Sequence, residues 1–147
     1  MNNKTLSNDF FDRLYKGYVA ENFITRQLFE YGFEAFRLPA DFGIDLVVTN
    51  QFNKLNKKEI DDNSFPFGFQ VKSRRLKESK LSEGANGRYE YRFDYSITHK
   101  EIKTLQEFPN SALAFVFVVP FGHSIKNIYV FCIHSREIGK MIQGKVF

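Results

Sequence analysis

The chain is poor in cysteine, has no tryptophan and lacks a long hydrophobic run. Its one cysteine, Cys132, excludes an intramolecular disulfide and a cysteine-rich zinc site. Because Cys132 lies within an apolar run, we expect it to be a small hydrophobic side chain of the core. The longest apolar run, residues 112–121, is too short to cross a bilayer, so no membrane association is expected.

Several catalytic signatures are also missing. The three histidines, His99, His123 and His134, do not have the His-Glu-x-x-His spacing of a zinc hydrolase. The sequence contains neither a glycine-rich phosphate loop nor a Gly-x-Ser-x-Gly turn. Residues 1–4 are polar or basic after the first methionine, so no signal peptide is expected and a cytoplasmic location is predicted.

The composition is that of a globular protein. Of the 147 residues, 43% are hydrophobic and 17% aromatic, which is enough apolar side chain for one domain over residues 1–147. The net charge of +4 is compatible with nucleic-acid binding without being diagnostic of it.

Residues 42–72 contain the main candidates for functional residues. Two short apolar runs, residues 43–48 and 67–72, have the composition of β-strands, and a polar segment separates them. Alternation along the first strand places Ile44, Leu46 and Val48 on one face and turns Asp45 away from them. In the second strand Gln70 and Lys72 share a face. If the two strands are neighbours, Asp45, Gln70 and Lys72 meet on one surface.

This pattern resembles the PD-(D/E)XK nuclease superfamily. The resemblance rests on Asp45, on Gln70-Val71-Lys72 in the next strand, and on a preceding helix that carries Glu21. It is closest to the branch with a Gln-x-Lys half-motif, which includes type IV restriction enzymes and relatives of archaeal Holliday-junction resolvases, and it extends to a bacterial nuclease-like domain family of unknown function. Ile44 stands where the family name has proline. The implied fold is α/β, a restriction-endonuclease-like mixed sheet flanked by helices.

The resemblance implies a metal-dependent endonuclease that hydrolyses DNA. Asp45 would be the main ligand of Mg²⁺ or Mn²⁺, the Gln70 amide oxygen and the Val71 carbonyl would add to it, and Glu21 would bind directly or through water. Lys72 would orient the attacking water or stabilise the charged phosphate. Gln70 stands where most members have a carboxylate, which lowers the negative charge of the site and should weaken metal affinity.

Glu21 lies in a segment, residues 9–31, with the apolar spacing of an amphipathic helix that Gly32 ends. Gly17, one turn earlier, would allow a close approach to the sheet. In the functional interpretation, the Glu21 side chain points toward the site. In the alternative, the apolar face of the helix is rotated slightly and Glu21 lies at its solvent-exposed edge. Asp41 is a second candidate for the catalytic carboxylate. We prefer Asp45 because it falls within a strand, whereas Asp41 suits a turn.

A basic segment follows Lys72. Arg74, Arg75 and Lys77 would hold a phosphate backbone, and the alternative is a solvated charged face.

The remaining elements complete the expected order. Residues 51–64 are predicted to be a loop or hairpin tip, and residues 88–97 a half-buried strand with an aromatic face in the core. Thr98 and Glu101 form a capping box that opens a helix to about Phe108. Two strands, residues 111–121 and 127–134, and a last helix, residues 136–143, follow.

Two further interpretations stay open beside the nuclease. A nuclease-like domain that has lost metal binding would bind only nucleic acid or a protein partner, and the motif could also be chance within a mixed α/β domain. The sequence contains no separate target-reading domain, so specificity would come from substrate shape or from a partner. A homodimer and a partner protein both stay open.

Overall fold

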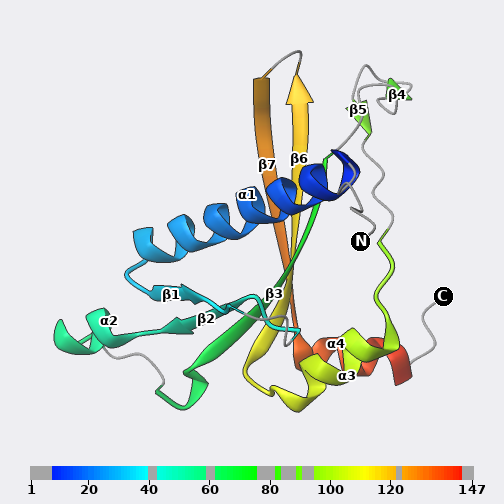
Figure 1. Cartoon of the computed structure of the whole chain (residues 1–147). Helices are drawn as coiled ribbons and strands as arrows, with labels where there is room; N and C mark the ends of the chain where they lie inside the picture. The colour runs from blue at the N-terminus through cyan, green and yellow to red at the C-terminus, as the bar shows by residue number, and fades with distance from the viewer. Residues whose placement is uncertain are drawn as a thin grey trace, which may run out of the picture.

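The computed structural model describes residues 8–39, 43–58, 62–75, 82–83, 89–90, 95–121 and 124–143. They form an α/β fold, a mixed five-stranded sheet with helices on both faces (Figure 1). The strand order is β1-β2-β3-β6-β7, in which β3 and β6 are parallel and the other neighbours antiparallel. The strands of this sheet are β1 (Glu34–Arg37), β2 (Leu46–Thr49), β3 (Phe67–Arg75), β6 (Ser111–Phe121) and β7 (Ser124–His134). The helices are α1 (Asn8–Glu30), α2 (Gln51–Leu55), α3 (His99–Glu107) and α4 (Ser135–Gln143), with a 3-10 turn η1 (Asp62–Ser64). The predicted α/β class, a mixed sheet flanked by helices, is therefore confirmed.

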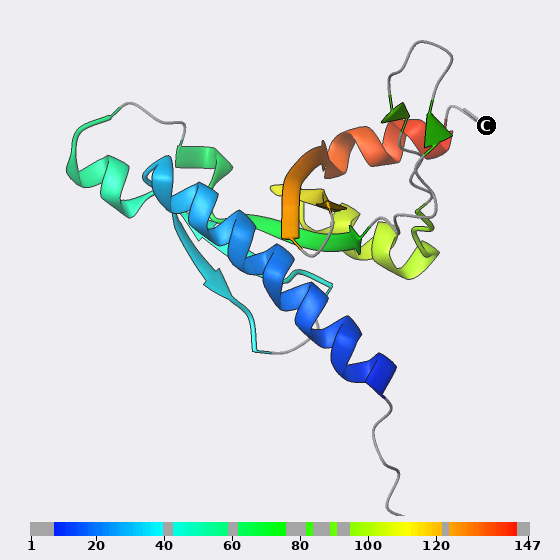
Figure 2. The same cartoon turned by 90° about the horizontal axis from the view of Figure 1, so that it is seen from above.

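Helix α1 covers one face of the sheet (Figure 2). Ala20 and Ile24 are buried against strand residues such as Leu46 and Val116. The helix ends where the sequence predicts, because Gly32 takes a positive φ of 81°, which glycine adopts without strain. The chain then reverses into β1, which places the first two strands beside α1.

Helices α3 and α4 cover the opposite face. Leu105 of α3 and Ile138 of α4 are buried with Leu113 and Phe115 of β6. The predicted capping box is present: the Thr98 hydroxyl accepts a hydrogen bond from the Glu101 amide, and the Glu101 carboxylate accepts one from the Thr98 amide. A parallel pair requires a crossover connection, and α3 lies in the one between β3 and β6.

The predicted loop over residues 51–64 is wrong in part, because it contains α2 and η1. The Asn50 side chain makes no capping bond to α2. Glu34 of β1 supplies the cap instead, accepting hydrogen bonds from the Gln51 amide at 2.9 Å and the Phe52 amide at 2.6 Å. A cap from 17 residues earlier in the chain leaves no local sequence signal.

Of the predicted strand over residues 88–97, residue 88 and residues 91–94 lie outside the described residues. Within it the structure has the two-residue strand β5 (Tyr89–Glu90), which pairs with β4 (Ser82–Glu83) in a separate small sheet. Tyr95 and Ile97 are outside any strand. The expected core role of the aromatic face holds for Tyr95, whose ring lies 4.6 Å from that of Phe115, centroid to centroid.

Two smaller expectations also fail. Cys132 is exposed rather than part of the core, because β7 is a terminal strand of the sheet and the helices do not cover all of it. Ile44 does not share a face with Leu46 and Val48. It packs in the cluster under α3, whereas Leu46 packs in the cluster under α1. Among the described residues, no helix is long and apolar enough to span a membrane.

Candidate functional site

Asp45 lies where β2 separates from β3. The β2–β3 ladder runs from Val48↔Phe67 to Leu46↔Phe69, so Asp45 precedes β2 instead of lying within it as predicted. Its amide still donates to the Phe69 carbonyl at 2.8 Å. Its carboxylate Oδ2 accepts a hydrogen bond from the Val71 amide at 2.6 Å. A side chain thus takes the place of a strand partner at the edge of β3.

The open edge continues from this point. In the described chain, no strand pairs with residues 70–75 of β3 on the β2 side. The Phe69 carbonyl and the Val71 amide both turn toward Asp45. Since the amide and carbonyl of one strand residue point to the same edge, the Val71 carbonyl oxygen also faces this edge.

Asp45, Gln70 and Lys72 line a single hollow of about 460 Å³ between β3 and the start of α3, which we call the Asp45 hollow. The ladder that pairs Leu46 with Phe69 places Asp45 opposite Gln70 in register, and Lys72 follows two residues later on the same face. The predicted convergence of these three side chains is therefore found. Among the described residues, the lining consists of Gly43, Asp45, Gln70, Val71, Lys72, Thr98, Lys100, Glu101 and Thr104.

Gln70 is buried, with 7% of its surface exposed, and its Oε1 has no hydrogen-bond partner in the described structure. A buried acceptor left unpaired costs about 1–3 kcal/mol. A ligand would remove this cost by bonding to the oxygen. An amide oxygen beside a carboxylate can bind a hard cation or accept a hydrogen bond from a donor.

The Lys72 ammonium is ion-paired with Glu101 of α3. The second carboxylate oxygen of Glu101 accepts hydrogen bonds from the Thr98 amide at 2.7 Å and the Thr98 hydroxyl at 2.9 Å. Burial raises the pKa of Glu101, but the bonds and charge from Lys72 and Thr98 outweigh burial and lower it overall. The helix cap thus fixes the counter-ion of the site lysine.

Glu101 was not among the residues predicted for the site. The sequence pattern that identified it, Thr98 with Glu101 three residues later, indicated a helix cap, and that role is present. Only the packing of α3 on β3 reveals that the same carboxylate reaches Lys72. Lys100 and Thr104 carry no sequence signal for the hollow that they line.

Glu21 does not line the Asp45 hollow. It belongs to α1, on the other face of the sheet, and its carboxylate Oε2 pairs with the Arg37 Nε at 2.8 Å. The Arg37 guanidinium in turn lies 3.8 Å from the centre of the Tyr18 ring. Burial raises the pKa of Glu21, Arg37 opposes that rise, and the charge of Asp45 adds to it. Glu21 and Asp45 are therefore close enough to repel each other across the sheet edge.

Gly17 does not bring α1 close to the sheet. A Cβ built there would meet the Glu21 carboxylate at 3.9 Å, and no described residue of the sheet lies within 4 Å of it. The role predicted for this glycine is wrong.

The basic segment is divided between the two faces. Arg74 pairs in register with Phe117 and its guanidinium lies 5.6 Å from the centre of the Tyr95 ring, on the α3 side. Arg75 pairs with Val118, which belongs to the cluster under α1. Lys77 and Asp41 lie outside the described residues.

The residues fit a divalent ion in part. Asp45 offers a carboxylate, Gln70 an unpartnered oxygen and Val71 a carbonyl at the open edge, which are hard oxygen donors. In the described part of the chain, no three histidine, cysteine, aspartate or glutamate side chains form a metal-binding group. The site would instead need amide and backbone oxygens beside the Asp45 carboxylate.

Comparison with protein-family models, with curated proteins and with solved structures gives no match to the chain.

Proposed function

We propose that this chain is a metal-dependent endonuclease with a restriction-endonuclease-like fold that hydrolyses DNA phosphodiester bonds in the Asp45 hollow. The observation that carries the proposal is the convergence of Asp45, which directly precedes β2, with Gln70 and Lys72 of β3 on one hollow. A carboxylate, an unpaired buried oxygen and an ammonium group in one hollow supply opposite charges for a cation and a phosphate.

Asp45, Gln70 and the Val71 carbonyl are the groups that would hold Mg²⁺ or Mn²⁺. When bound, such an ion stabilises negative charge on a phosphate and makes a nearby water more acidic. Asp45 accepts the Val71 amide through Oδ2, so the orientation of its carboxylate is fixed before any ligand arrives. A preorganised group loses little entropy on binding.

Lys72 supplies the positive charge for the phosphate oxygens. Its ammonium already has an anionic partner in Glu101, so a phosphate would share or replace that partner. Lys100, at the start of α3, adds a second positive charge to the lining. The N-terminus of a helix also stabilises nearby negative charge. The charge pattern of the hollow therefore suits a phosphodiester.

A second function is favoured by two ion pairs. Lys72 is paired with Glu101 and Glu21 with Arg37, so two of the four residues proposed for catalysis have protein partners. If these pairs persist in the presence of DNA, the chain would be an inactive nuclease-like module that binds nucleic acid or a protein.

Cleavage assays separate the two functions. We would incubate the protein with Mg²⁺ or Mn²⁺ and with plasmid, single-stranded, branched and methylated DNA, and with RNA. Wild-type protein should cut at least one DNA substrate, and Asp45→Ala and Lys72→Met should not. DNA binding without cleavage under every condition would support the inactive module, and equal cleavage by Asp45→Ala would reject the site.

A further inference from the structure

A second hollow lies on the other face of the sheet, between α1 and the far end of β3. It has a volume of about 190 Å³. Val118 of β6, which is 8% exposed, is one of its apolar walls, and Tyr15 and Val19, one turn apart on α1, form another. Lys16, Ser73, Arg74 and Arg75 complete the lining. We call it the Tyr15 hollow.

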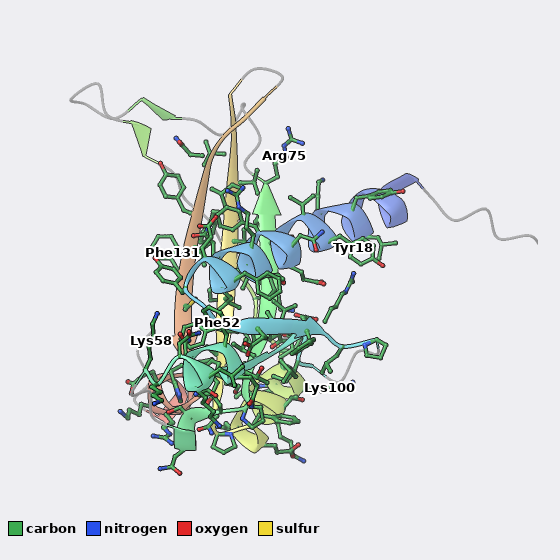
Figure 3. The ribbon with its side chains drawn as sticks, turned by 90° about the vertical axis from the view of Figure 1, so that its left-hand side faces the viewer. Tyr18, Phe52, Lys58, Arg75, Lys100 and Phe131 are labelled. Carbon is green, nitrogen blue, oxygen red and sulfur yellow. The ribbon has the colours of Figure 1, made fainter. Side chains whose placement is uncertain are left out.

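Its chemistry differs from that of the Asp45 hollow. An exposed tyrosine ring and two valines give it an apolar interior, and among the described residues of its lining the charged side chains on the α1 side, Lys16 and Arg75, are basic. Figure 3 shows Arg75 beside the end of β3, next to the ribbon of α1. An aromatic face beside basic side chains is the combination that binds a nucleobase together with its phosphate.

Both hollows use the same strand. Lys72 and Arg75 are three residues apart on β3, or about 10 Å along an extended strand. That is about three base steps of a stacked DNA strand. Between them β3 has an open edge, with Asp45 at its start. A chain of nucleotides bound in the Asp45 hollow can thus reach the Tyr15 hollow along this edge.

The path must pass from one face of the sheet to the other. Lys72 faces α3, whereas Arg75 and Tyr15 are on the α1 side. Duplex DNA has a persistence length of about 50 nm and does not bend around a strand edge over so short a distance. A single strand bends freely and has unpaired bases to stack.

We propose that the Tyr15 hollow binds an unpaired base of a single-stranded segment next to the phosphate held at Lys72. The substrate class would then be single-stranded DNA or a duplex with an unpaired end. This inference rests on the proposed nuclease function for the use of the Asp45 hollow, but base binding itself does not require cleavage.

Binding without metal tests the proposal. The probes are a fluorescein-labelled single-stranded oligonucleotide of roughly 12 nucleotides, a common site size, and the matching duplex, both in chelator. We expect tighter binding to the single strand. Tyr15→Ala should weaken that binding about 5- to 150-fold, as loss of one stacked base does, and leave duplex binding unchanged. Tyr15→Phe should bind like the wild type because it keeps the ring.

Tyr31→Ala is the matched control. Tyr31 is 72% exposed and Tyr15 65%, and Tyr31 follows the other end of α1, away from both hollows. It should bind like the wild type. Arg75→Ala should reduce the salt dependence of single-strand binding by about 0.7 in slope, the value for one phosphate contact.

A base analogue locates the contact. 2-Aminopurine placed at successive positions should lose fluorescence at one position by stacking, and Tyr15→Ala should restore it. Unchanged single-strand affinity in Tyr15→Ala, an equal loss on duplex, or an equal loss in Tyr31→Ala would overturn the proposal.

The test of base binding in the Tyr15 hollow can fail or succeed independently of the test of nuclease activity. Single-strand binding that depends on Tyr15, without cleavage under any condition, would support the Tyr15 hollow and reject the nuclease. Cleavage that depends on Asp45 in a protein whose Tyr15→Ala variant binds and cuts single strands normally would support the nuclease and reject the hollow.

Discussion

The two halves of β3 differ in what surrounds them. Residues 67–69 pair with β2, and residues 68 and 69 also pair with β6 on the other side; the side chains of this half are apolar or glycine. Residues 70–75 pair with β6 alone in the described structure, and they include Gln70, Lys72 and Arg75. Where the second neighbour ends, backbone groups and polar side chains become available for a ligand.

The comparison shows how one strand can stabilise the fold and bind a ligand. The paired half is held on both edges by the ladder, which fixes the position of the half that follows. Asp45 marks the boundary, because its amide still bonds to Phe69 whereas its carboxylate bonds to Val71. Changes in the first half should therefore reduce stability, and changes in the second half should reduce activity or ligand binding.

Asp45→Asn should give the largest effect, and this effect should be on cleavage activity and not on stability. Cleavage should fall by at least about a hundredfold, because the variant loses the negative charge that would hold the ion. Asparagine can still accept the Val71 amide, and the repulsion of Glu21 disappears. Thermal melts in chelator should therefore show a variant no less stable than the wild type.

The same melts with Mg²⁺ provide the control. Wild-type protein should melt at a higher temperature with Mg²⁺, because a ligand of the folded state stabilises it, and Asp45→Asn should not respond. If Asp45→Asn melts well below the wild type in chelator and Mg²⁺ shifts neither protein, Asp45 is a structural residue.

Phe69→Ala tests the paired half. Phe69 packs against the cluster under α1 and its ring centroid lies 5.1 Å from that of Phe67, so its removal should lower the free energy of unfolding by about 2–3 kcal/mol. Activity per folded molecule should stay near that of the wild type. Ser73→Ala, in the open half, is the matched control and should change stability by less than about 0.5 kcal/mol. Equal stability losses for both variants would remove the distinction between the halves.

Gln70→Glu tests the residue at the boundary between the paired and the open half of β3. A second carboxylate opposite Asp45 should lower stability in chelator by about 1–2 kcal/mol, because the position is 7% exposed and like charges repel. The variant should bind Mg²⁺ more tightly, which isothermal titration would measure. Lower stability with no gain in affinity would argue against an ion at Gln70.

Glu101→Gln should give the smallest effect, and one that depends on pH. The lowered pKa of Glu101 means that the folded state favours its charged form. Its stabilisation is fully present above the ordinary value of 4.5 and is lost as the pH falls through the lower folded value. At neutral pH the variant should be less stable by about 1 kcal/mol. Denaturant melts should show this difference shrinking below about pH 4.5, and a constant difference would contradict the ion pair with Lys72.

The part of the site within one strand could be predicted from local sequence, because Gln70 and Lys72 are two residues apart. Gln70 and Lys72 share a face by strand alternation, and an antiparallel neighbour places Asp45 in register with them. The capping box at Thr98 and the end of α1 at Gly32 are equally local, since each depends on bonds or dihedral angles within a few residues.

The contacts that the sequence did not reveal join distant segments. Glu34 caps α2, Glu101 pairs with Lys72 and Arg37 pairs with Glu21, and each pair is separated by 16 residues or more. Charged side chains are long and make bonds in many directions, so their partners depend on how helices pack on the sheet. The sequence by itself determined that Gln70 and Lys72 share a face, and the pairing of β2 with β3 then brought Asp45 opposite Gln70. The tertiary structure alone decided which charges neutralise them, where β3 loses its second neighbour, and that Arg74 and Arg75 face opposite sides of the sheet.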